Sequence, residues 1–347
     1  MTQQAGGVAL NLPGPYLLFL GDSKLPDFAK TAFGLRDWAP DRCVGEWALP
    51  EATVTTGLER LSPEAAYARG ARAVVIGVAN VGGHIPEPWI TALTQCLAAG
   101  LDVISGMHTR LGTIPALAEA AIRHGRRLYD VRVPPEKIPV GTGRKRSGKR
   151  LLTVGTDCAL GKKYTALAIA RALAARGVPA TFRATGQTGI LIAGGGMPMD
   201  AVVADFEAGA AEILSPDAAP GHWDIIEGQG SLFHPGYAAV SLGLLHGSQP
   251  DVIIACHQPG RTHITGLEQY ALPTLEELID LTIRLGRRVN PRIRCGGISL
   301  NTAHLDDASR RAVFEETSRA LGLPVADPMR PGRDFDALIS NLAGAGG

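Results

Sequence analysis

The sequence lacks the features that mark membrane, nucleic-acid-binding and secreted proteins. Its 347 residues carry a net charge of only +1, so no strong field favours a nucleic acid or a charged membrane surface. No apolar run is long enough for a membrane span, and the first residues lack the basic region and apolar core of a signal peptide. We therefore predict a cytoplasmic protein whose partner is a small molecule, with no nucleic acid and no membrane as a partner.

Cysteine is also scarce. The five cysteines are scattered and form no C-x-x-C pair, so we expect reduced thiols and predict no metal centre. Glycine and proline, by contrast, number 43 and 24 and follow no fixed period. This pattern fits many tight turns between strands and helices rather than disorder.

Short apolar segments alternate with helix-length amphipathic segments along the whole chain. Such alternation indicates βαβ units and parallel sheets, and the Val/Ile/Leu-rich strands indicate sheets buried on both faces. The predicted strands span residues 16–20, 73–78, 101–105, 127–131, 151–155, 180–184, 223–227, 251–255 and 294–300. The predicted helices span residues 26–34, 88–99, 114–124, 165–175, 200–214, 274–285 and 308–321.

A stretch rich in Pro, Gly, Lys and Arg interrupts this pattern over residues 136–150 and indicates a domain boundary. We interpret it as a solvated basic linker, with phosphate binding as the alternative. The prediction is an α/β protein with two Rossmann-like parallel-sheet domains, residues 1–135 and 151–347. The C-terminal domain is predicted to have a P-loop NTPase-like fold.

The most informative motif is the loop of residues 155–163, which lies between a predicted strand and a predicted helix. A helix N-terminus offers unpaired backbone N–H groups and partial positive charge, and a Lys at this place adds a charge for phosphate. The residues predicted to bind the phosphates of a cofactor are Gly155, Thr156, Asp157, Cys158, Gly161, Lys162 and Lys163. A Gly-rich turn without a ligand is the alternative.

The same loop departs from the usual G-x-x-x-x-G-K-[ST] pattern in two ways. It has one more residue between Gly155 and Gly161, and Lys163 stands where the hydroxyl that binds Mg²⁺ should be. Thr165 is a poor substitute, because two residues along a helix rotate the side chain by about 200°. We therefore predict a phosphate site without the usual Mg²⁺ ligand.

Polar residues follow several other predicted strands at the same sheet edge, where ligands of parallel α/β proteins bind. Glu227 could hold a metal or take a proton if burial raises its pKa, with a loop-ordering role as the alternative. His257 is a candidate base, and Arg261 is a candidate for binding a carboxylate; surface solvation is the alternative for Arg261. Cys158 lies near a helix N-terminus, but no His or Asn stands beside it in sequence, so the pattern does not favour a nucleophile.

The loop and the Glu-Gly-Gln-Gly segment at 227–230 resemble those of dethiobiotin synthetase-like P-loop proteins, which carry Thr where this chain has Lys163. The whole chain resembles a closer group, the two-domain P-loop family long of unknown function that includes D-glutamate N-acetyltransferases. The motifs that carry this resemblance lie at 30–32 with Trp38, 78–83, 100–111, 125–132, 155–162, 226–232 and 257–261.

What the resemblance implies is an N-acetyltransferase of D-amino-acid catabolism that moves an acetyl group from acetyl-CoA to the amino group of D-glutamate. A phosphate loop without its metal hydroxyl suits CoA better than Mg-ATP. The alternatives are an ATP- and Mg²⁺-dependent carboxylate-activating ligase or kinase, and a nucleotide-sensing binding module. A homo-oligomer, such as a dimer, would be ordinary for a metabolic enzyme of this size.

For direct transfer, a base must take a proton from the substrate ammonium, and Glu227 and His257 are our candidates. The two carboxylates of D-glutamate need cationic anchors, for which Arg261 and Arg110 are predicted, with His108 as a further substrate contact. We place this substrate site in the cleft between the domains. For His108 and Arg110, interdomain salt bridges are the alternative.

Overall fold

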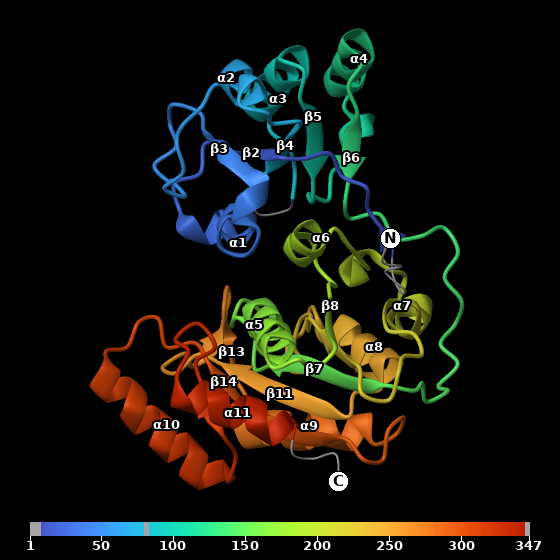
Figure 1. Ribbon diagram of the computed structural model, residues 1–347, viewed down its shortest axis with the longest axis vertical. Coiled ribbons are helices and arrows are strands. Elements are labelled where there is room, and N and C mark those ends of the chain that lie inside the picture. The colour runs from blue at the N-terminus through green and yellow to red at the C-terminus, as the bar shows by residue number, and fades with distance from the viewer. Residues whose placement is uncertain (1–7, 80–82, 344–347) are drawn as a thin grey trace. The chain divides into compact units, whose positions relative to one another are not determined.

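The computed structural model describes residues 8–79 and 83–343, which fall into two compact units. The N-terminal unit comprises Ala9–Pro134 together with Gln187–Pro198, and the C-terminal unit comprises Val8, Pro135–Gly186 and the residues from Met199 onward. Both are α/β units with helices packed around a parallel sheet (Figure 1). The predicted fold class is therefore confirmed.

Within its described residues, the N-terminal unit is built on a five-stranded parallel sheet of order β3-β2-β4-β5-β6. Its central strands form because their apolar residues are covered on both faces, and every residue from Tyr16 to Phe19 is fully buried. The strands are β1 (Val8–Ala9), β2 (Tyr16–Phe19), β3 (Cys43–Trp47), β4 (Ala73–Ile76), β5 (Asp102–Ser105), β6 (Leu128–Asp130) and β9 (Gly195–Gly196). The helices are α1 (Lys30–Trp38), α2 (Pro63–Ala68), α3 (Glu87–Ala98), α4 (Pro115–His124) and α6 (Gln187–Ala193).

The C-terminal unit has, among the residues described, a six-stranded parallel sheet of order β15-β14-β11-β7-β10-β8. The strands are β7 (Lys149–Gly155), β8 (Ala180–Arg183), β10 (Trp223–Ile226), β11 (Val252–His257), β14 (Arg294–Leu300) and β15 (Val325–Ala326), with a hairpin of β12 (His263–Ile264) and β13 (Leu267–Ala271). The helices are α5 (Lys162–Ala175), α7 (Glu207–Leu214), α8 (Ala238–Ser248), α9 (Leu275–Gly286), α10 (Asp307–Leu321) and α11 (Arg333–Ala343).

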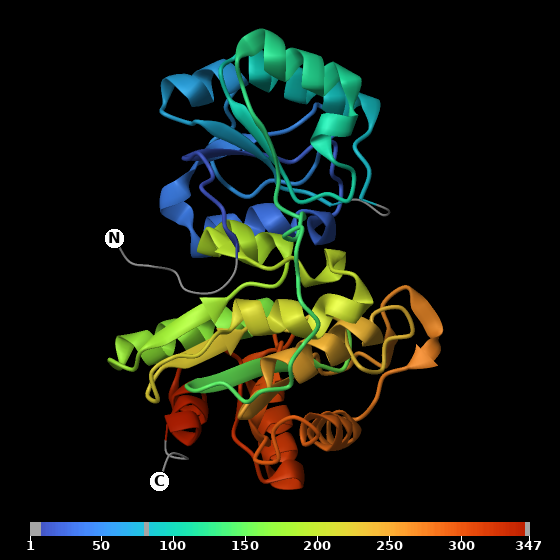
Figure 2. The same ribbon diagram turned by 90° about the vertical axis from the view of Figure 1, so that its right-hand side faces the viewer.

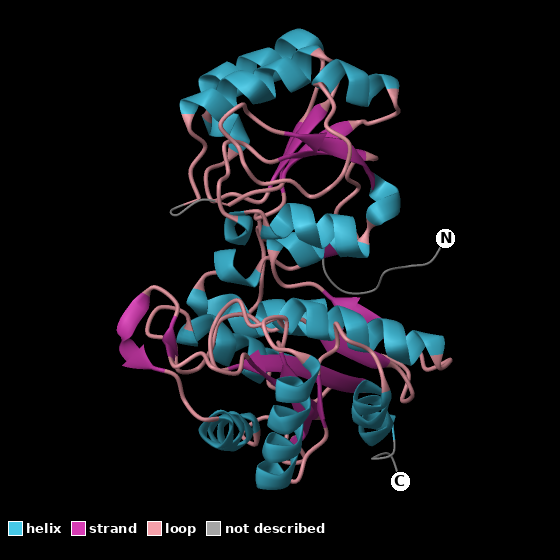
Figure 3. Ribbon diagram, turned by 90° about the vertical axis from the view of Figure 1, so that its left-hand side faces the viewer, coloured by secondary structure: helices cyan, strands magenta, loops and turns pink. Residues whose placement is uncertain are grey.

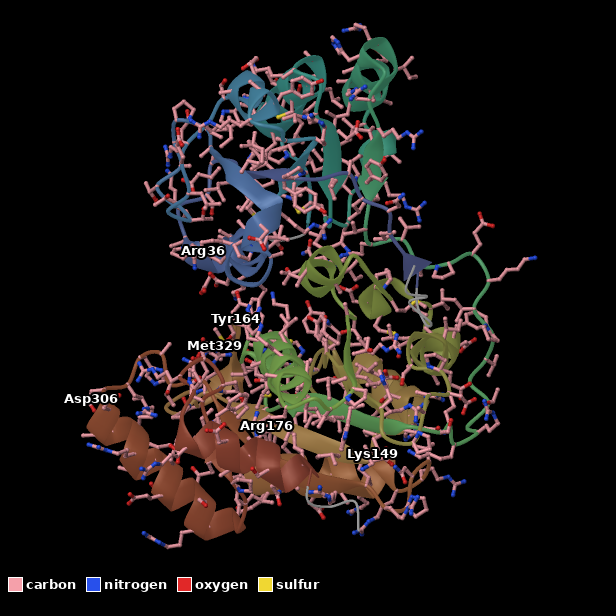
Figure 4. The ribbon with its side chains drawn as sticks, viewed as in Figure 1. Arg36, Lys149, Tyr164, Arg176, Asp306 and Met329 are labelled. Carbon is pink, nitrogen blue, oxygen red and sulfur yellow. The ribbon has the colours of Figure 1, made fainter. Side chains whose placement is uncertain are left out.

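The helices of the C-terminal unit form layers around this sheet, as Figures 2 and 3 show. Helix α5 packs on β7, β8 and β10 and contacts α11. Helix α8 packs against α7 and against α9. Arg176, which is labelled in Figure 4, follows the last residue of α5. Its guanidinium pairs with Asp336 of α11. Because β7 lies between β11 and β10 in the sheet, the loop that follows β7 lies in the middle of the sheet edge.

One segment lies elsewhere than the sequence suggests. Residues 187–198 follow β8 and were assigned to the predicted C-terminal domain, yet they cluster with the N-terminal unit. There α6 packs on α1, and the hydroxyls of Thr188 and Thr31 lie 2.9 Å apart in a buried hydrogen bond. The contact between α6 and α1 joins distant parts of the chain, so the local sequence does not reveal it.

The basic stretch at 136–150 is mostly exposed over residues 136–145, and Arg146 and Arg150 near its end are buried in the C-terminal unit. Arg146 is 5% exposed, and its guanidinium donates to the carbonyls of Ser215 (2.6 Å) and Gly247 (2.7 Å). Burial lowers the pKa of Arg146 to about 10. Lys145 pairs with Asp251 at 2.8 Å. These cations hold the end of the stretch on the C-terminal unit through hydrogen bonds to carbonyl oxygens and an ion pair with a carboxylate. Their partners lie far away in the sequence, so the local sequence does not indicate these contacts.

Candidate functional site

The 155–163 loop joins the end of β7 to the start of α5, as predicted. Ala159 and Gly161 have positive φ angles of 56° and 101°, and these left-handed residues turn the chain from strand to helix. Lys162 is 7% exposed, and its ammonium donates to the carbonyl of Asp157 across the loop at 2.7 Å. Burial lowers the pKa of Lys162, while negative charge on Cys158 opposes this shift. The lysine therefore spans the loop with its charge in a largely dry site.

Asp157 braces the loop rather than facing outward. Its carboxylate is fully buried and accepts hydrogen bonds from the backbone N–H groups of Cys158 (2.6 Å) and Thr265 (3.0 Å). The same carboxylate pairs with the guanidinium of Arg261 at 3.1 Å. Both carboxylate oxygens are thus engaged within the protein. The roles of these residues toward a ligand stay predictions.

In the first turn of α5, neither Thr165 nor Lys163 takes the place of the hydroxyl that usually binds Mg²⁺. The hydroxyl of Thr165 lies 2.7 Å from that of Ser299 in the core, so it points away from the loop, as its helical offset predicts. Lys163 lies over the ring of Tyr164, with its nitrogen 4.9 Å from the ring centre, and Tyr164 projects from this first turn in Figure 4. Neither residue supplies the hydroxyl that the usual pattern requires.

Glu227 follows β10 and is a buried carboxylate, 4% exposed. One of its oxygens accepts the backbone N–H groups of Thr185 (2.9 Å) and Gly186 (3.2 Å). Burial raises the pKa of Glu227, and the nearby charge of Lys163 opposes this shift. The loop-ordering role is therefore part of the structure, and a raised pKa also suits a proton acceptor that works near neutrality.

Gly228 allows the turn after β10 to approach strand β7 closely. A Cβ atom at this position would lie 1.7 Å from the carbonyl oxygen of Thr153, so only glycine fits. The Gly228 N–H donates to the Thr153 hydroxyl at 2.9 Å. This N–H group is therefore already engaged within the protein.

His257 ends β11 beside the loop. Its Nδ1 lies 2.9 Å from the hydroxyl of Thr156, whose own N–H donates to the carbonyl of Cys256 at 3.2 Å. Burial lowers the pKa of His257, and the charge of Arg261 lowers it further. A lowered pKa favours the neutral ring, and the contact with Thr156 places it beside the loop, which suits the base that we predict.

Sequence reasoning missed His234. This residue is 7% exposed, and its Nδ1 accepts the N–H of Gly236 at 3.0 Å. A carboxylate oxygen of Asp157, the sulfur of Cys158 and a ring nitrogen of His234 all lie within 4.8 Å of one another. The only signal in the sequence was that His234 follows β10 at the same sheet edge, a few residues after the motif at 227–231.

Such a trio could also hold a metal ion, so the donor set matters. Asp157 has both oxygens engaged and its charge neutralised by Arg261, which makes it a weak metal ligand. The absence of a metal centre stays a prediction.

Arg261 contacts several groups of the loop. Besides Asp157, it donates to the carbonyl of Cys158 (3.1 Å) and to the side chain of Gln258 (2.6 Å). Arg183, at the end of β8, pairs with the buried Asp224 at 2.8 Å. Arg261 is therefore a loop-bracing residue, and its contact with a substrate carboxylate stays a prediction.

His108 and Arg110 lie in the N-terminal unit, after β5. His108 is exposed, and its Nε2 lies 2.8 Å from the guanidinium of Arg132. Arg110 is exposed and close enough to Asp130 to oppose the rise that burial causes in the pKa of this carboxyl. Residues 80–82 of the motif at 78–83 lie outside the described residues. The substrate contacts predicted for His108 and Arg110 stay predictions.

No helix in the described part of the chain is both long and apolar enough to cross a membrane.

Comparison with known proteins shows which family the chain resembles. Two family models match: the Rossmann-like domain of unknown function DUF1611_N over residues 42–134, and the P-loop domain of unknown function DUF1611_C over residues 139–338.

Named relatives match over nearly the full length. A D-glutamate N-acetyltransferase of Tritonibacter scottomollicae is 52% identical over 330 residues, which cover 94% of this chain and 98% of that protein. A D-glutamate N-acetyltransferase of a Pseudoalteromonas species is 44% identical over 333 residues, which cover 96% of this chain and 100% of that protein. The crystal structure of a DUF1611 family protein from Anabaena variabilis has a TM-score of 0.84 and 32% identity, covering 95% of this chain and 99% of that one.

Proposed function

The chain belongs to the DUF1611 family, and from this premise we propose that it is a D-glutamate N-acetyltransferase. The observation that carries the proposal is the relative of that name, which is 52% identical and is covered over 98% of its length. An acetyltransferase needs an acetyl donor, and we propose acetyl-CoA. A small molecule is the acceptor, and we propose the amino group of D-glutamate.

We propose that the donor binds at the 155–163 loop. The N-terminus of α5 and the charge of Lys162 favour a negative group, and the missing metal hydroxyl fits a donor that reacts without Mg²⁺. Two parts of acetyl-CoA meet this description. One is its phosphates, and the other is the thioester oxygen, which becomes negative as the acetyl carbon is attacked.

The amine of D-glutamate must lose a proton before or during attack, because only the neutral amine has a lone pair. We propose Glu227 or His257 as the base. Both lie at the sheet edge next to the loop; burial raises the pKa of Glu227 and lowers that of His257. Glu227→Gln can keep the two backbone hydrogen bonds and removes only the charge, so it separates catalysis from loop ordering.

The test is a direct assay of the purified protein. Acetyl-CoA and D-glutamate should yield N-acetyl-D-glutamate and CoA, identified by mass spectrometry, and L-glutamate should be run in parallel. Turnover of ATP with Mg²⁺ and glutamate, without any product from acetyl-CoA, would replace this proposal with the ligase or kinase alternative. If Glu227→Gln and His257→Gln both keep a near-wild-type kcat, neither residue is the base.

A further inference from the structure

Three groups with complementary chemistry meet at the 155–163 loop. The sulfur of Cys158 lies within 4.8 Å of a ring nitrogen of the buried His234 and of an oxygen of the Asp157 carboxylate. The negative charge of Asp157 opposes a thiolate, but it is offset by Arg261, which pairs with this carboxylate at 3.1 Å. Cys158 is also close enough to Lys162 for charge on one to affect the other. Its place just before α5, a helix of 14 residues, adds the positive end of that helix. A thiol, an imidazole, an ammonium and a helix N-terminus together are the setting in which cysteine acts as a nucleophile.

Hydrogen bonding suits His234 for this role. The Gly236 N–H donates to Nδ1, so the neutral ring carries its hydrogen on Nε2 and is a donor there. A donor imidazole and a lysine ammonium both stabilise a thiolate over a thiol. The thiolate is the reactive form in attack on a thioester.

We propose that Cys158 carries the acetyl group between donor and amine, so that the reaction proceeds through an acetyl-cysteine thioester. This inference rests on the proposed acetyltransferase function. In the first half-reaction the Cys158 thiolate attacks the acetyl carbon, a new C–S bond forms, and the bond to the CoA sulfur breaks. The electron pair of the broken bond leaves with CoA, whose thiolate takes a proton from water.

In the second half-reaction the amine of D-glutamate attacks the acetyl carbon on Cys158. The C–N bond forms, the bond to Sγ breaks, and the base proposed above takes the amine proton. The Cys158 thiolate returns to the environment of Lys162 and His234. Acetyl-CoA and D-glutamate are thus converted to CoA and N-acetyl-D-glutamate with no other reactant.

This inference also decides which end of the donor meets the loop. The phosphates and the thioester of acetyl-CoA are separated by the long pantetheine arm, so a single short loop cannot hold both. If Cys158 attacks the acetyl carbon, the N–H groups at the start of α5 and the Lys162 ammonium receive the thioester oxygen, as an oxyanion hole does. The loop would then be a phosphate-binding motif adapted to acyl transfer.

The other cysteines provide matched controls. Burial raises the pKa of Cys43 and of Cys295 to about 11, and that of Cys256 also to about 11. Cys96 is fully buried, and burial raises its pKa well above the ordinary value. Their thiols are poor nucleophiles at neutral pH, so covalent labelling should discriminate Cys158 from the rest.

The decisive experiment uses the wild-type protein with acetyl-CoA and no amine. After an acid quench, peptide mapping by mass spectrometry should find one acetyl group on Cys158, removable by hydroxylamine. Isotopically labelled CoA should also exchange into acetyl-CoA under these conditions. A short donor without phosphates, S-acetyl-N-acetylcysteamine, should acetylate the same residue.

Variants provide the second arm. Cys158→Ala and Cys158→Ser should show no exchange and should lower kcat by a factor of at least about 10³, the scale of losing a covalent nucleophile. Cys43→Ala and Cys295→Ala should retain exchange and turnover. His234→Ala should move the pH dependence of Cys158 alkylation by iodoacetamide to higher pH, a change that mere loss of packing would not cause.

The outcomes separate this inference from the function on which it rests. If the wild type makes N-acetyl-D-glutamate but shows neither exchange nor acetylated Cys158, transfer is direct and the inference is overturned. If Cys158 becomes acetylated but D-glutamate does not accept the group, the thioester stands and the proposed acceptor is wrong. If neither occurs, both are rejected.

Discussion

Asp157 and Arg261 are separated by 104 positions in the chain, yet their side chains pair at 3.1 Å. The carboxylate is fully buried, and the guanidinium comes from the turn after β11. This pair fixes the loop after β7 to its neighbour across the sheet edge. Both residues were predicted to contact ligands, but in the structure their first contacts are with each other.

Replacing Arg261 by Gln should therefore destabilise the C-terminal unit. Removing one partner of a buried ion pair leaves an uncompensated carboxylate, which costs about 3–5 kcal/mol. Urea unfolding should show this loss. The matched control is Arg310→Gln, whose partner Asp307 is 77% exposed, and which should cost less than about 1 kcal/mol. Equal stability of the two variants would show that the Asp157 pair does not brace the fold.

Lys162→Met should weaken the use of the donor while leaving the fold in place. The ammonium bonds the Asp157 carbonyl across the loop, and we propose that it also donates to the negative group of the donor. Loss of this second, charge-assisted hydrogen bond should cost about 1–3 kcal/mol of binding. We expect kcat/KM for acetyl-CoA to fall by the corresponding factor of about 10 to 10². Arg176→Gln at the other end of α5 is the control and should leave this ratio unchanged. An unaffected Lys162→Met enzyme would remove the lysine from the site.

Acetyl transfer should continue in excess EDTA. Thr165 is bonded to Ser299 in the core and Lys163 replaces the usual hydroxyl, so the loop offers no ordinary Mg²⁺ ligand. The rate of CoA release should be the same with EDTA and with added Mg²⁺. Loss of activity in EDTA, with recovery on adding Mg²⁺, would contradict this prediction and favour metal-dependent chemistry.

Much of the fold could be predicted because its strands are continuous apolar runs covered on both faces. The predicted strand at 151–155 matches β7 except for its first two residues, and the predicted strand at 294–300 matches the whole of β14. Helix α8 was missed because it is apolar almost all round, so no amphipathic period marks it. Helix α11 does show such a period, with Phe335, Leu338, Ile339 and Leu342 buried, and should have been found.

The sequence could predict which loops of the site meet at the sheet edge, but not which side chains contact one another there. The rule that loops gather at the carboxyl edge of a parallel sheet predicts that the 155–163 loop, Glu227 and His257 lie close together. In the structure Thr156 contacts His257, and Lys163 is close enough to Glu227 to affect its pKa. The rule could not show that Cys158 meets His234, because the turn after β10 sets that distance. It also could not show which charges the protein uses internally, as with Arg261 and Arg183.

Gly228→Ala should disrupt the packing between β10 and β7. A Cβ atom would lie 1.7 Å from the Thr153 carbonyl oxygen, so the backbone must shift, at a cost of about 1–3 kcal/mol or more. The midpoint of urea unfolding and kcat should both fall. Gly221→Ala is the control, because a Cβ atom there has no neighbour within 4 Å. A variant at Gly228 as stable as this control would show that the close approach is easily relieved.

The last prediction concerns the protonation of His257. Burial and the charge of Arg261 lower its pKa, so the folded protein binds a proton at this site less readily than the unfolded chain. Stability from this group is therefore complete above the ordinary value of 6.5 and is lost as the pH falls toward and below the lowered value. An NMR titration of the His257 ring should give a midpoint below 6.5 in the wild type.

Arg261→Gln should raise that midpoint, because it removes the nearby positive charge, whereas Arg310→Gln should not. If His257 is the base, the acid limb of the kcat profile should move to higher pH in Arg261→Gln by the same amount, since the base works only when neutral. A midpoint that moves while the acid limb stays fixed would show that His257 titrates as described but does not take the proton of the amine. Glu227 would then be the remaining candidate.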